Sequence, residues 1–312
     1  MKHNEVKIKQ KPLSGFLGEL SVNRYLYLLA IPVLLYYALF CYLPMCGIVI
    51  AFKNYNIGQG IMESQWVGLK NFKEFFASVY FIRLLKNTFL ISIYDLAVGF
   101  PTPIIFALLL NEVKNAIFKK TVQTVTYLPH FISMVVICGM IINFFGTDGI
   151  LTKFLTLFGA DNINYVGNKD SFRSIYVWSN VWQTIGWNSI IYLAALSGID
   201  QQLYEAASID GAGRFRRLIH VTLPGIMQTI IVMLILRLGQ ILSVGYEKII
   251  LLYSPGTYET ADVISSYVYR TGLQGSRYSY STAVGLFQSL INITILFSAN
   301  MTCRKTMHTS LF

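Results

Sequence analysis

The sequence predicts an all-α membrane protein with six transmembrane helices. Of its 312 residues, 54% are hydrophobic and only 13% are charged, whereas soluble domains carry about 25% charged residues. The apolar residues also gather in blocks of about 20 or more, the length that a helix needs to cross roughly 30 Å of hydrocarbon. Because backbone groups in lipid must be hydrogen-bonded within the protein, continuous apolar runs of this length favour helices.

The predicted spans follow the apolar blocks in chain order. The first block is too long for a cleaved secretion signal, and no small-residue cleavage site follows it before Pro44, so it is expected to stay as an anchor. Pro101 and Pro103 are expected to kink the second span, because proline lacks the N–H that a helix interior needs. The spans comprise residues 25–52, 87–110, 121–145, 175–196, 226–246 and 281–303.

The net charge of +10 is distributed in a way that indicates orientation. Lysines and arginines precede the first span, occupy the second and fourth connections and follow the last span. These regions lie on one side if the spans alternate, and the positive-inside rule places that side, with both termini, in the cytoplasm. Retention of cations against anionic membrane lipid accounts for the charge, so no nucleic-acid partner is expected.

The expected organisation has three parts within a multi-pass protein of the cell membrane. A cytoplasmic segment at 1–24 precedes a six-helix transmembrane domain at 25–303, and a cytoplasmic tail follows at 304–312. No motif typical of an enzyme occurs: a GxxxxGK[ST] phosphate loop, HExxH and GxSxG are all absent. The four cysteines lack metal-ligand spacing and the four histidines are scattered. We therefore expect no catalytic residue, no metal site and no cofactor bound by this chain.

The loop at residues 197–224 is the most informative segment. Asp200 can cap a helix start, because its carboxylate can accept free backbone N–H bonds. Four residues of the following helix share one face by their spacing of three, four and seven positions, and two alanines keep that face flat enough for another surface to approach closely. These residues are Leu203, Ala206, Ala207 and Asp210.

The same loop has a defined end. Gly211 suits the left-handed position that terminates a helix, and Pro224 marks re-entry into the bilayer after a short second helix. Glu205 projects beside the flat face, where it can pair with a cation or accept N–H bonds. Another protein that binds this cytoplasmic loop can move it relative to the membrane spans. The loop therefore indicates a membrane subunit driven by a separate protein. The residues that we assign to this coupling loop are Leu203, Glu205, Ala206, Ala207, Asp210, Gly211, Ala212, Leu223 and Pro224.

The loop resembles a known family. Glu205-Ala206-Ala207, Gly211 and Val221-Thr222-Leu223-Pro224 look like the EAA loop of the membrane subunits of binding-protein-dependent ABC importers, with Val221 where isoleucine is usual. The resemblance continues along the chain, and the Asp-Gly-Ala extension at 210–212 is similar to the carbohydrate-uptake branch. Further matches lie at 66–72, 106–112 and 127–129, and those at 258–264 and 267–270 are similar to the LplB-like subgroup, associated with complex oligosaccharides.

The resemblance implies a type I ABC importer permease fold with a cytoplasmic EAA coupling helix. It implies pairing with a second permease subunit of the same family and with two ABC ATPase subunits, which use ATP and Mg. An extracytoplasmic solute-binding protein would deliver a carbohydrate, and the helix around the EAA sequence would insert into a groove of the ATPase. ATP at one end and loaded binding protein at the other would then bias two states of one molecule.

Two charges fall inside predicted spans. Asp95 and Arg237 each cost at least ~2.5–3.5 kcal/mol at the centre of a bilayer, so they should face protein or water. Because the second and fifth spans run in opposite directions, the two residues reach similar depths and an arginine side chain can bridge the remainder. A structural ion pair is the main interpretation, and contact with substrate is the alternative.

Two polar and aromatic sets are candidates for the transport pathway. Sugars stack on aromatic faces and need hydrogen-bond partners, and both kinds of group occur in the fourth and fifth spans. The alternative is an aromatic belt at the membrane surface for the tryptophans. The two sets are Trp182, Gln183 and Asn188, and Gln240, Ser243 and Tyr246.

Other classes of function explain less of the sequence. A secondary transporter usually has repeated halves and broken helices, and no matching halves are visible. A membrane scaffold or receptor leaves the loop pattern unexplained. Within the importers, a peptide or phosphodiester substrate remains open beside an oligosaccharide.

Overall fold

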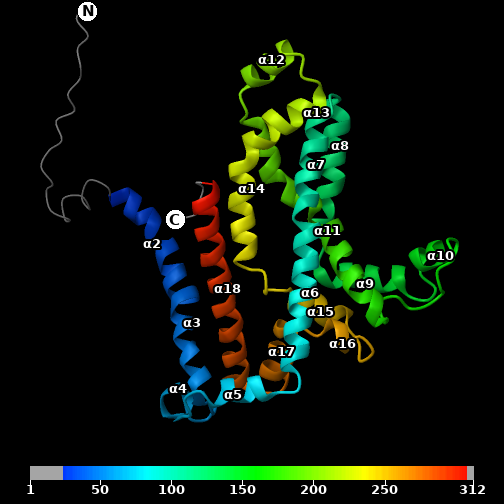
Figure 1. The fold of residues 1–312 in the computed structure, drawn as a ribbon. Helices are drawn as coiled ribbons and strands as arrows, with labels where there is room; N and C mark the ends of the chain where they lie inside the picture. The colour runs from blue at the N-terminus through cyan, green and yellow to red at the C-terminus, as the bar shows by residue number, and fades with distance from the viewer. Residues whose placement is uncertain (1–23, 308–312) are drawn as a thin grey trace, which may run out of the picture.

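The computed structural model describes residues 24–307, which form long helices joined by short ones (Figure 1). Five helical segments are long and apolar enough to cross a membrane: Tyr25–Phe52, Phe81–Glu112, Met134–Thr156, Arg214–Leu238 and Tyr278–Lys305. A sixth long helix, α11 (Lys169–Ser197), is more polar. The predicted class of multi-pass, all-α membrane protein is confirmed. Of the predicted terminal segments, residues 1–23 and 308–312 lie outside the described part.

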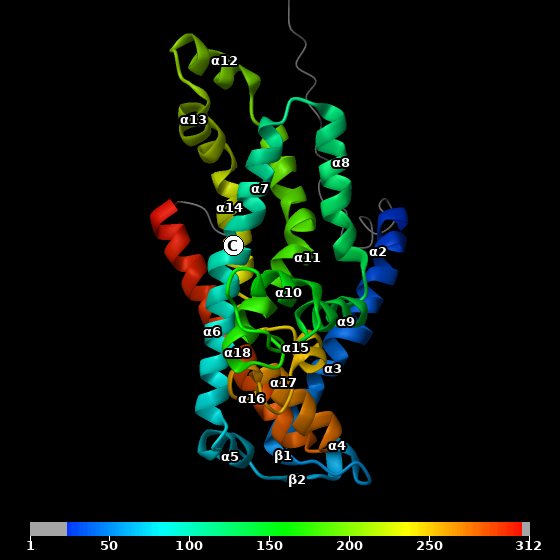
Figure 2. The same cartoon turned by 90° about the vertical axis from the view of Figure 1, so that its right-hand side faces the viewer.

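The first span stands at the side of the molecule. It consists of α2 (Arg24–Tyr36), η1 (Tyr37–Tyr42), α3 (Leu43–Met45) and η2 (Cys46–Phe52). None of its most apolar stretch is buried within the described chain. Its last part, η2, packs against α18 (Tyr278–Met307), whereas Figure 2 shows α2 on the other side of the molecule from the C-terminal end of α18. Below it, β1 (Lys53–Asn54) pairs antiparallel with β2 (Gln65–Trp66). The short helices α4 (Gly60–Glu63) and α5 (Lys70–Ala77) complete that end of the molecule.

The helix α11 is the packing centre of the bundle. The second span, α6 (Phe81–Gly99) and α7 (Pro101–Glu112), lies along it, and the helix is interrupted at Phe100, next to the prolines expected to kink it. On another side, α8 (Ala116–Tyr127) crosses α11 at Gly186. A Cβ atom at Gly186 would stand 2.3 Å from the carbonyl oxygen of Thr126, so only glycine permits this approach of the two helices.

The prediction of one continuous third span at 121–145 was wrong. The helix α8 ends at Tyr127, a 3-10 turn η3 covers Leu128–Phe131, and α9 (Met134–Phe145) begins after Ser133. Pro129 has no N–H to donate, and its ring is crowded against the carbonyl four residues earlier. The backbone leaves helical geometry three residues later, at Ile132, with φ −78° and ψ +137°. Ser133 then caps the new helix by accepting from the N–H of Val136, so the chain changes direction before α9 and α10 (Ile150–Thr156) (Figure 1).

The fifth span also differs from the prediction of a helix at 226–246. The chain enters through α13 (Arg214–Arg217) and η4 (Leu218–Thr222), and α14 (Leu223–Leu238) stops eight residues early. Residues 239–245 are not helical, and α15 (Tyr246–Leu252) follows. Two amide side chains of α18 satisfy the unwound backbone: Asn292 accepts from the N–H of Leu242 at 3.1 Å, and Gln288 donates to its carbonyl at 2.8 Å. Such partners permit irregular backbone inside a membrane protein.

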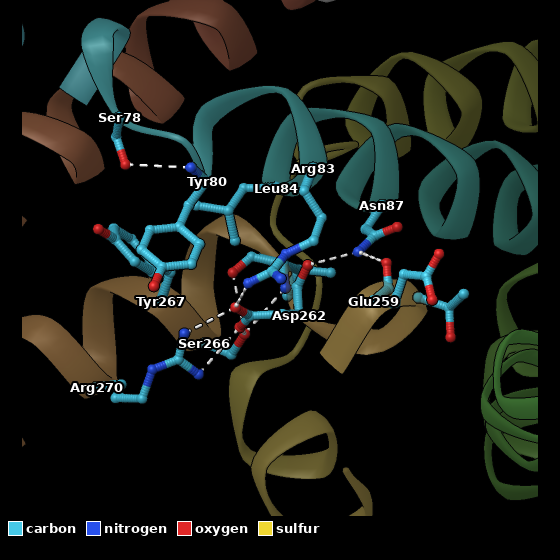
Figure 3. A network of polar contacts seen from close by, with 12 residues as sticks. Ser78, Tyr80, Arg83, Leu84, Asn87, Glu259, Asp262, Ser266, Tyr267 and Arg270 are labelled. Carbon is cyan, nitrogen blue, oxygen red and sulfur yellow. Dashed lines mark hydrogen bonds and ion pairs between the residues drawn. The ribbon is translucent and has the colours of Figure 1, made fainter. Parts of the chain in front are cut away.

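A buried carboxylate holds the segment after α15 against α6 (Figure 3). Asp262, between α16 (Tyr258–Ala261) and α17 (Ile264–Tyr269), has a fully buried side chain. It accepts two bonds from Arg270 in η5 (Arg270–Gln274), at 2.7 and 3.2 Å, and lies 3.5 Å from Arg83 of α6. Asn87 of α6 donates to the backbone carbonyl of Asp262 at 3.0 Å. Burial lowers the pKa of Arg270, but the bonds to Asp262 and its charge hold that pKa above its ordinary value.

We expect Asp262→Ala to lower the free energy of unfolding by about 3 kcal/mol, because it leaves two partly buried guanidinium groups without their counter-charge. The unfolding midpoint of the purified subunit in detergent measures this. Glu74→Ala is the matched control, since it breaks an ion pair to Arg277 in which both side chains are about half exposed, and such pairs contribute at most about 1 kcal/mol. Equal shifts in both variants would contradict the structural role of Asp262.

Candidate coupling loop and transport cavity

The predicted loop helix is α12 (Gln201–Ile209), and its start is capped as its sequence indicated. The Oδ1 atom of Asp200 accepts a hydrogen bond from the N–H of Gln202 at 2.9 Å. Figures 1 and 2 both place α12 at one extremity of the molecule, opposite the end that carries β1 and β2. This position leaves the helix free on its outer side.

Gly211 ends α12 in the left-handed conformation, with φ +73°. Its N–H donates to the carbonyl of Ser208 at 3.1 Å, and the N–H of Ala212 donates to the carbonyl of Ala207 at 2.9 Å. Together these two bonds form a Schellman motif, which satisfies carbonyls that the helix itself leaves free. The direction in which the chain leaves α12 therefore depends on a backbone conformation that only glycine adopts readily.

Two contacts tie α12 to the following helical turn. The hydroxyl of Tyr204 lies 3.1 Å from that of Thr222, and Arg217 donates to the Oγ of Ser208 at 3.0 Å. The four residues expected to share one face of the helix differ in exposure. Ala207 shares the half-buried face with Tyr204, whereas the other three are exposed: Leu203, Ala206 and Asp210.

The exposed surface of the loop is apolar as well as polar. Leu203 is 53% exposed, Ile209 87% and Phe215 of α13 73%. Of the other predicted loop residues, Glu205 and Pro224 are exposed, whereas Ala212 and Leu223 are half-buried. Three large apolar side chains exposed within one short loop are typical of a site that contacts another protein. We define this exposed side of residues 200–217 as the coupling surface.

A polar cavity of about 290 Å³ lies where the unwound segment 239–245 meets α6 and α11. A second cavity of about 450 Å³ adjoins it on the side towards α12. The two share four polar residues in the wall between them: Asp95, Asn180, Arg237 and Gln240.

The charges predicted from the second and fifth spans meet in that shared wall. Arg237 of α14 forms an ion pair with Asp95 of α6, and Asn180 of α11 donates to the other carboxylate oxygen of Asp95 at 2.8 Å. The Asp95 side chain is 10% exposed and that of Arg237 is 49% exposed. The pair therefore joins three helices at the point where one cavity passes into the other.

The structure distributes the other predicted pathway residues among several places. Gln240 lines both cavities, Ser243 and Tyr246 line the first, and Asn188 lines the second. Trp182 instead lines a separate, apolar pocket against α9, and Gln183 is buried among other residues.

Helix geometry explains this division of α11. Asn180, Thr184 and Asn188 follow one another at intervals of four, so they share the face towards the cavities, whereas Trp182 lies about 200° around the helix from Asn180. Asn180 and Thr184 escaped the sequence analysis, although their spacing with Asn188 was a usable signal. Ser92 and Lys248 also line the first cavity, and no local pattern marks them.

A multi-pass helical protein with an exposed, firmly capped loop helix and polar cavities inside its bundle has the features of a membrane transport subunit. The family model "Binding-protein-dependent transport system inner membrane component" matches residues 87–305. The chain belongs to this family.

Individual relatives agree with this membership. The chain is 44% identical to Protein LplB of Bacillus subtilis (strain 168) over 96% of this chain and 94% of that protein. It is 43% identical to the polygalacturonan/rhamnogalacturonan transport system permease protein YteP of the same strain, over 96% and 94%. A chain of a bacterial alginate ABC transporter, solved in complex with a periplasmic protein bound to an alginate pentasaccharide, superposes with a TM-score of 0.86. It is 42% identical, with 95% of this chain and 99% of that chain covered.

Proposed function

We propose that this chain is the membrane-spanning permease subunit of an ATP-driven importer that moves an oligosaccharide or related carbohydrate. The observation that carries the proposal is the coupling surface: a capped helix that exposes apolar side chains at one extremity, on the residues that resemble the EAA loop. The family membership supports the same function. The chain itself is a transport component and not an enzyme.

The assembly we propose contains three kinds of protein partner. A second permease subunit of the same family completes the pathway, and two cytoplasmic ABC ATPase subunits bind the coupling surface and hydrolyse ATP with Mg. An extracytoplasmic solute-binding protein delivers the ligand at the opposite end. In this orientation both termini, the segment 1–24 and the tail 304–312 are cytoplasmic, and the coupling loop spans 197–224.

Carbohydrate is the substrate class we favour over a peptide or a phosphodiester. The cavities offer hydroxyl and amide groups from α6, α11 and the unwound segment, which suit the hydroxyl groups of a sugar. The relatives named for polygalacturonan, rhamnogalacturonan and alginate support this choice.

The proposal predicts that the purified subunit alone hydrolyses no ATP, because it lacks a phosphate loop. When it is co-expressed with its partners and the assembly is reconstituted in proteoliposomes, we expect ATP hydrolysis that the loaded binding protein stimulates. The same proteoliposomes should accumulate sugar. ATP hydrolysis and radiolabelled uptake measure the two results. Robust hydrolysis by the subunit alone, or accumulation without ATP, would count against the proposal.

A further inference from the structure

The first cavity contains a buried cation without an anionic partner. Lys248 of α15 is 2% exposed and lines the cavity. Its ammonium donates one long hydrogen bond, 3.4 Å, to the backbone carbonyl of Tyr176. The same ammonium lies 5.2 Å from the centre of the Tyr176 ring. Within residues 24–307 it forms no ion pair. An ammonium has three donors, so this one is poorly satisfied for a charge removed from water.

The same cavity has a second unsatisfied polar group. Ser92 of α6 is 6% exposed, and its hydroxyl has no hydrogen-bond partner among the described residues. Other hydroxyls of these helices donate to a carbonyl four residues earlier, as Thr88 and Thr184 do. A serine hydroxyl turns readily between staggered positions, so Ser92 is free to bond to a molecule in the cavity.

The other charges of the cavity do not balance Lys248. Asp95 is taken by Arg237 and Asn180, so that pair is neutral as a unit. Glu247 also lines the cavity but is exposed, and water solvates its carboxylate. Among the charged residues that line the cavity, Lys248 is therefore the buried one that no opposite charge contacts. Buried charges in proteins are normally paired, and an anionic ligand supplies the missing partner.

We propose that this cavity receives an acidic sugar residue, with the Lys248 ammonium binding the carboxylate and Ser92 bonding to a hydroxyl or carboxylate oxygen of the same residue. The inference rests on the proposed carbohydrate function and narrows it to oligosaccharides that contain uronic acid. A volume of about 290 Å³ corresponds to roughly ten waters at about 30 Å³ each, which is room for one sugar ring and a few waters. Lys248 would then bind one uronic acid residue of a longer oligosaccharide while that oligosaccharide moves through the cavity.

Equilibrium binding of two radiolabelled probes tests the inference directly. The probes are a trimer of galacturonic acid and the same trimer with its carboxyl groups reduced to alcohols. The assembly of both permease subunits and both ATPases is used without binding protein, so that binding reports the membrane subunits. We expect the wild type to favour the acidic trimer, and Lys248→Met to weaken acidic-trimer binding about tenfold or more, the effect of one charge-assisted hydrogen bond. The neutral trimer should bind Lys248→Met and wild type alike.

Two further variants distinguish binding from structure. Lys248→Arg keeps the charge and should retain the preference, whereas Lys169→Met removes an exposed cation outside the cavity and should change nothing. Because removing an unpaired buried charge relieves its desolvation cost, Lys248→Met should be folded at least as well as wild type.

The inference is overturned if Lys248→Met weakens binding of both trimers equally or lowers the folded yield. It is also overturned if the wild type does not bind the acidic trimer more tightly than the neutral one. ATP-dependent uptake of the neutral trimer alone would overturn it while leaving the permease function intact. Failure to take up either trimer or any other oligosaccharide would remove the carbohydrate function as well.

Discussion

Gly211→Pro is expected to abolish solute uptake while the subunit remains in the membrane at normal abundance. Proline cannot adopt the φ of +73° found here and has no N–H to donate to Ser208. The Schellman motif is therefore lost, and α12 can no longer present its exposed side chains in one orientation to the ATPases. Because the site lies outside the long apolar helices, insertion should be unaffected. ATP-dependent uptake, membrane abundance and ATPase co-purification are the measurements.

Gly213→Ala provides the matched control for this variant. Gly213 lies two residues further along the same loop, has φ −65°, and a Cβ atom there would meet nothing within 4 Å. Its uptake should be close to wild type. Gly211→Ala should fall between the two, since an alanine in the left-handed region costs roughly 1–2 kcal/mol. Wild-type uptake by Gly211→Pro would mean that the loop is not the coupling element.

The second large effect is expected at the ion pair between the cavities. Arg237→Gln leaves the 10%-exposed Asp95 carboxylate with only the amide of Asn180, and Asp95→Asn leaves Arg237 without its counter-charge. Each change should lower the free energy of unfolding by about 1–3 kcal/mol, the usual contribution of a hydrogen bond to a charged group. Half of the Arg237 side chain is exposed, so solvent screens the guanidinium that Asp95→Asn leaves unpaired. The loss for Asp95→Asn should therefore lie towards the lower end of this range.

A double-mutant cycle separates direct contact from two independent effects. With Asp95→Asn and Arg237→Gln combined, part of the loss should be recovered, giving a coupling energy of about 0.5–3 kcal/mol. Folded yield and the unfolding midpoint in detergent measure each corner of the cycle. Asn188 lines the second cavity but takes no part in the ion pair or in the hydrogen bond that Asn180 donates to it, so Asn188→Ala should have little effect. Strictly additive losses would exclude a direct interaction between Asp95 and Arg237.

The sequence by itself determined the membrane class, most span positions and the local geometry of the coupling loop. These features depend on short stretches of chain: 20 apolar residues meet the thickness of a bilayer, Asp200 caps the helix that starts beside it, and Gly211 ends that helix with its own backbone. The depths of Asp95 and Arg237 could also be compared by counting helical rise.

Only the tertiary structure decided where helices break and which groups meet in the cavities. The fifth span unwinds after Leu238 because Gln288 and Asn292, about 50 positions along the chain, satisfy the backbone of Leu242. Lys248 lies in the cavity because that unwound segment turns α15 inward. Such partners are distant in sequence, so no local periodicity encodes them. Burial and hydrogen bonding between helices select these conformations over the continuous helix that residues 226–246 favour on their own.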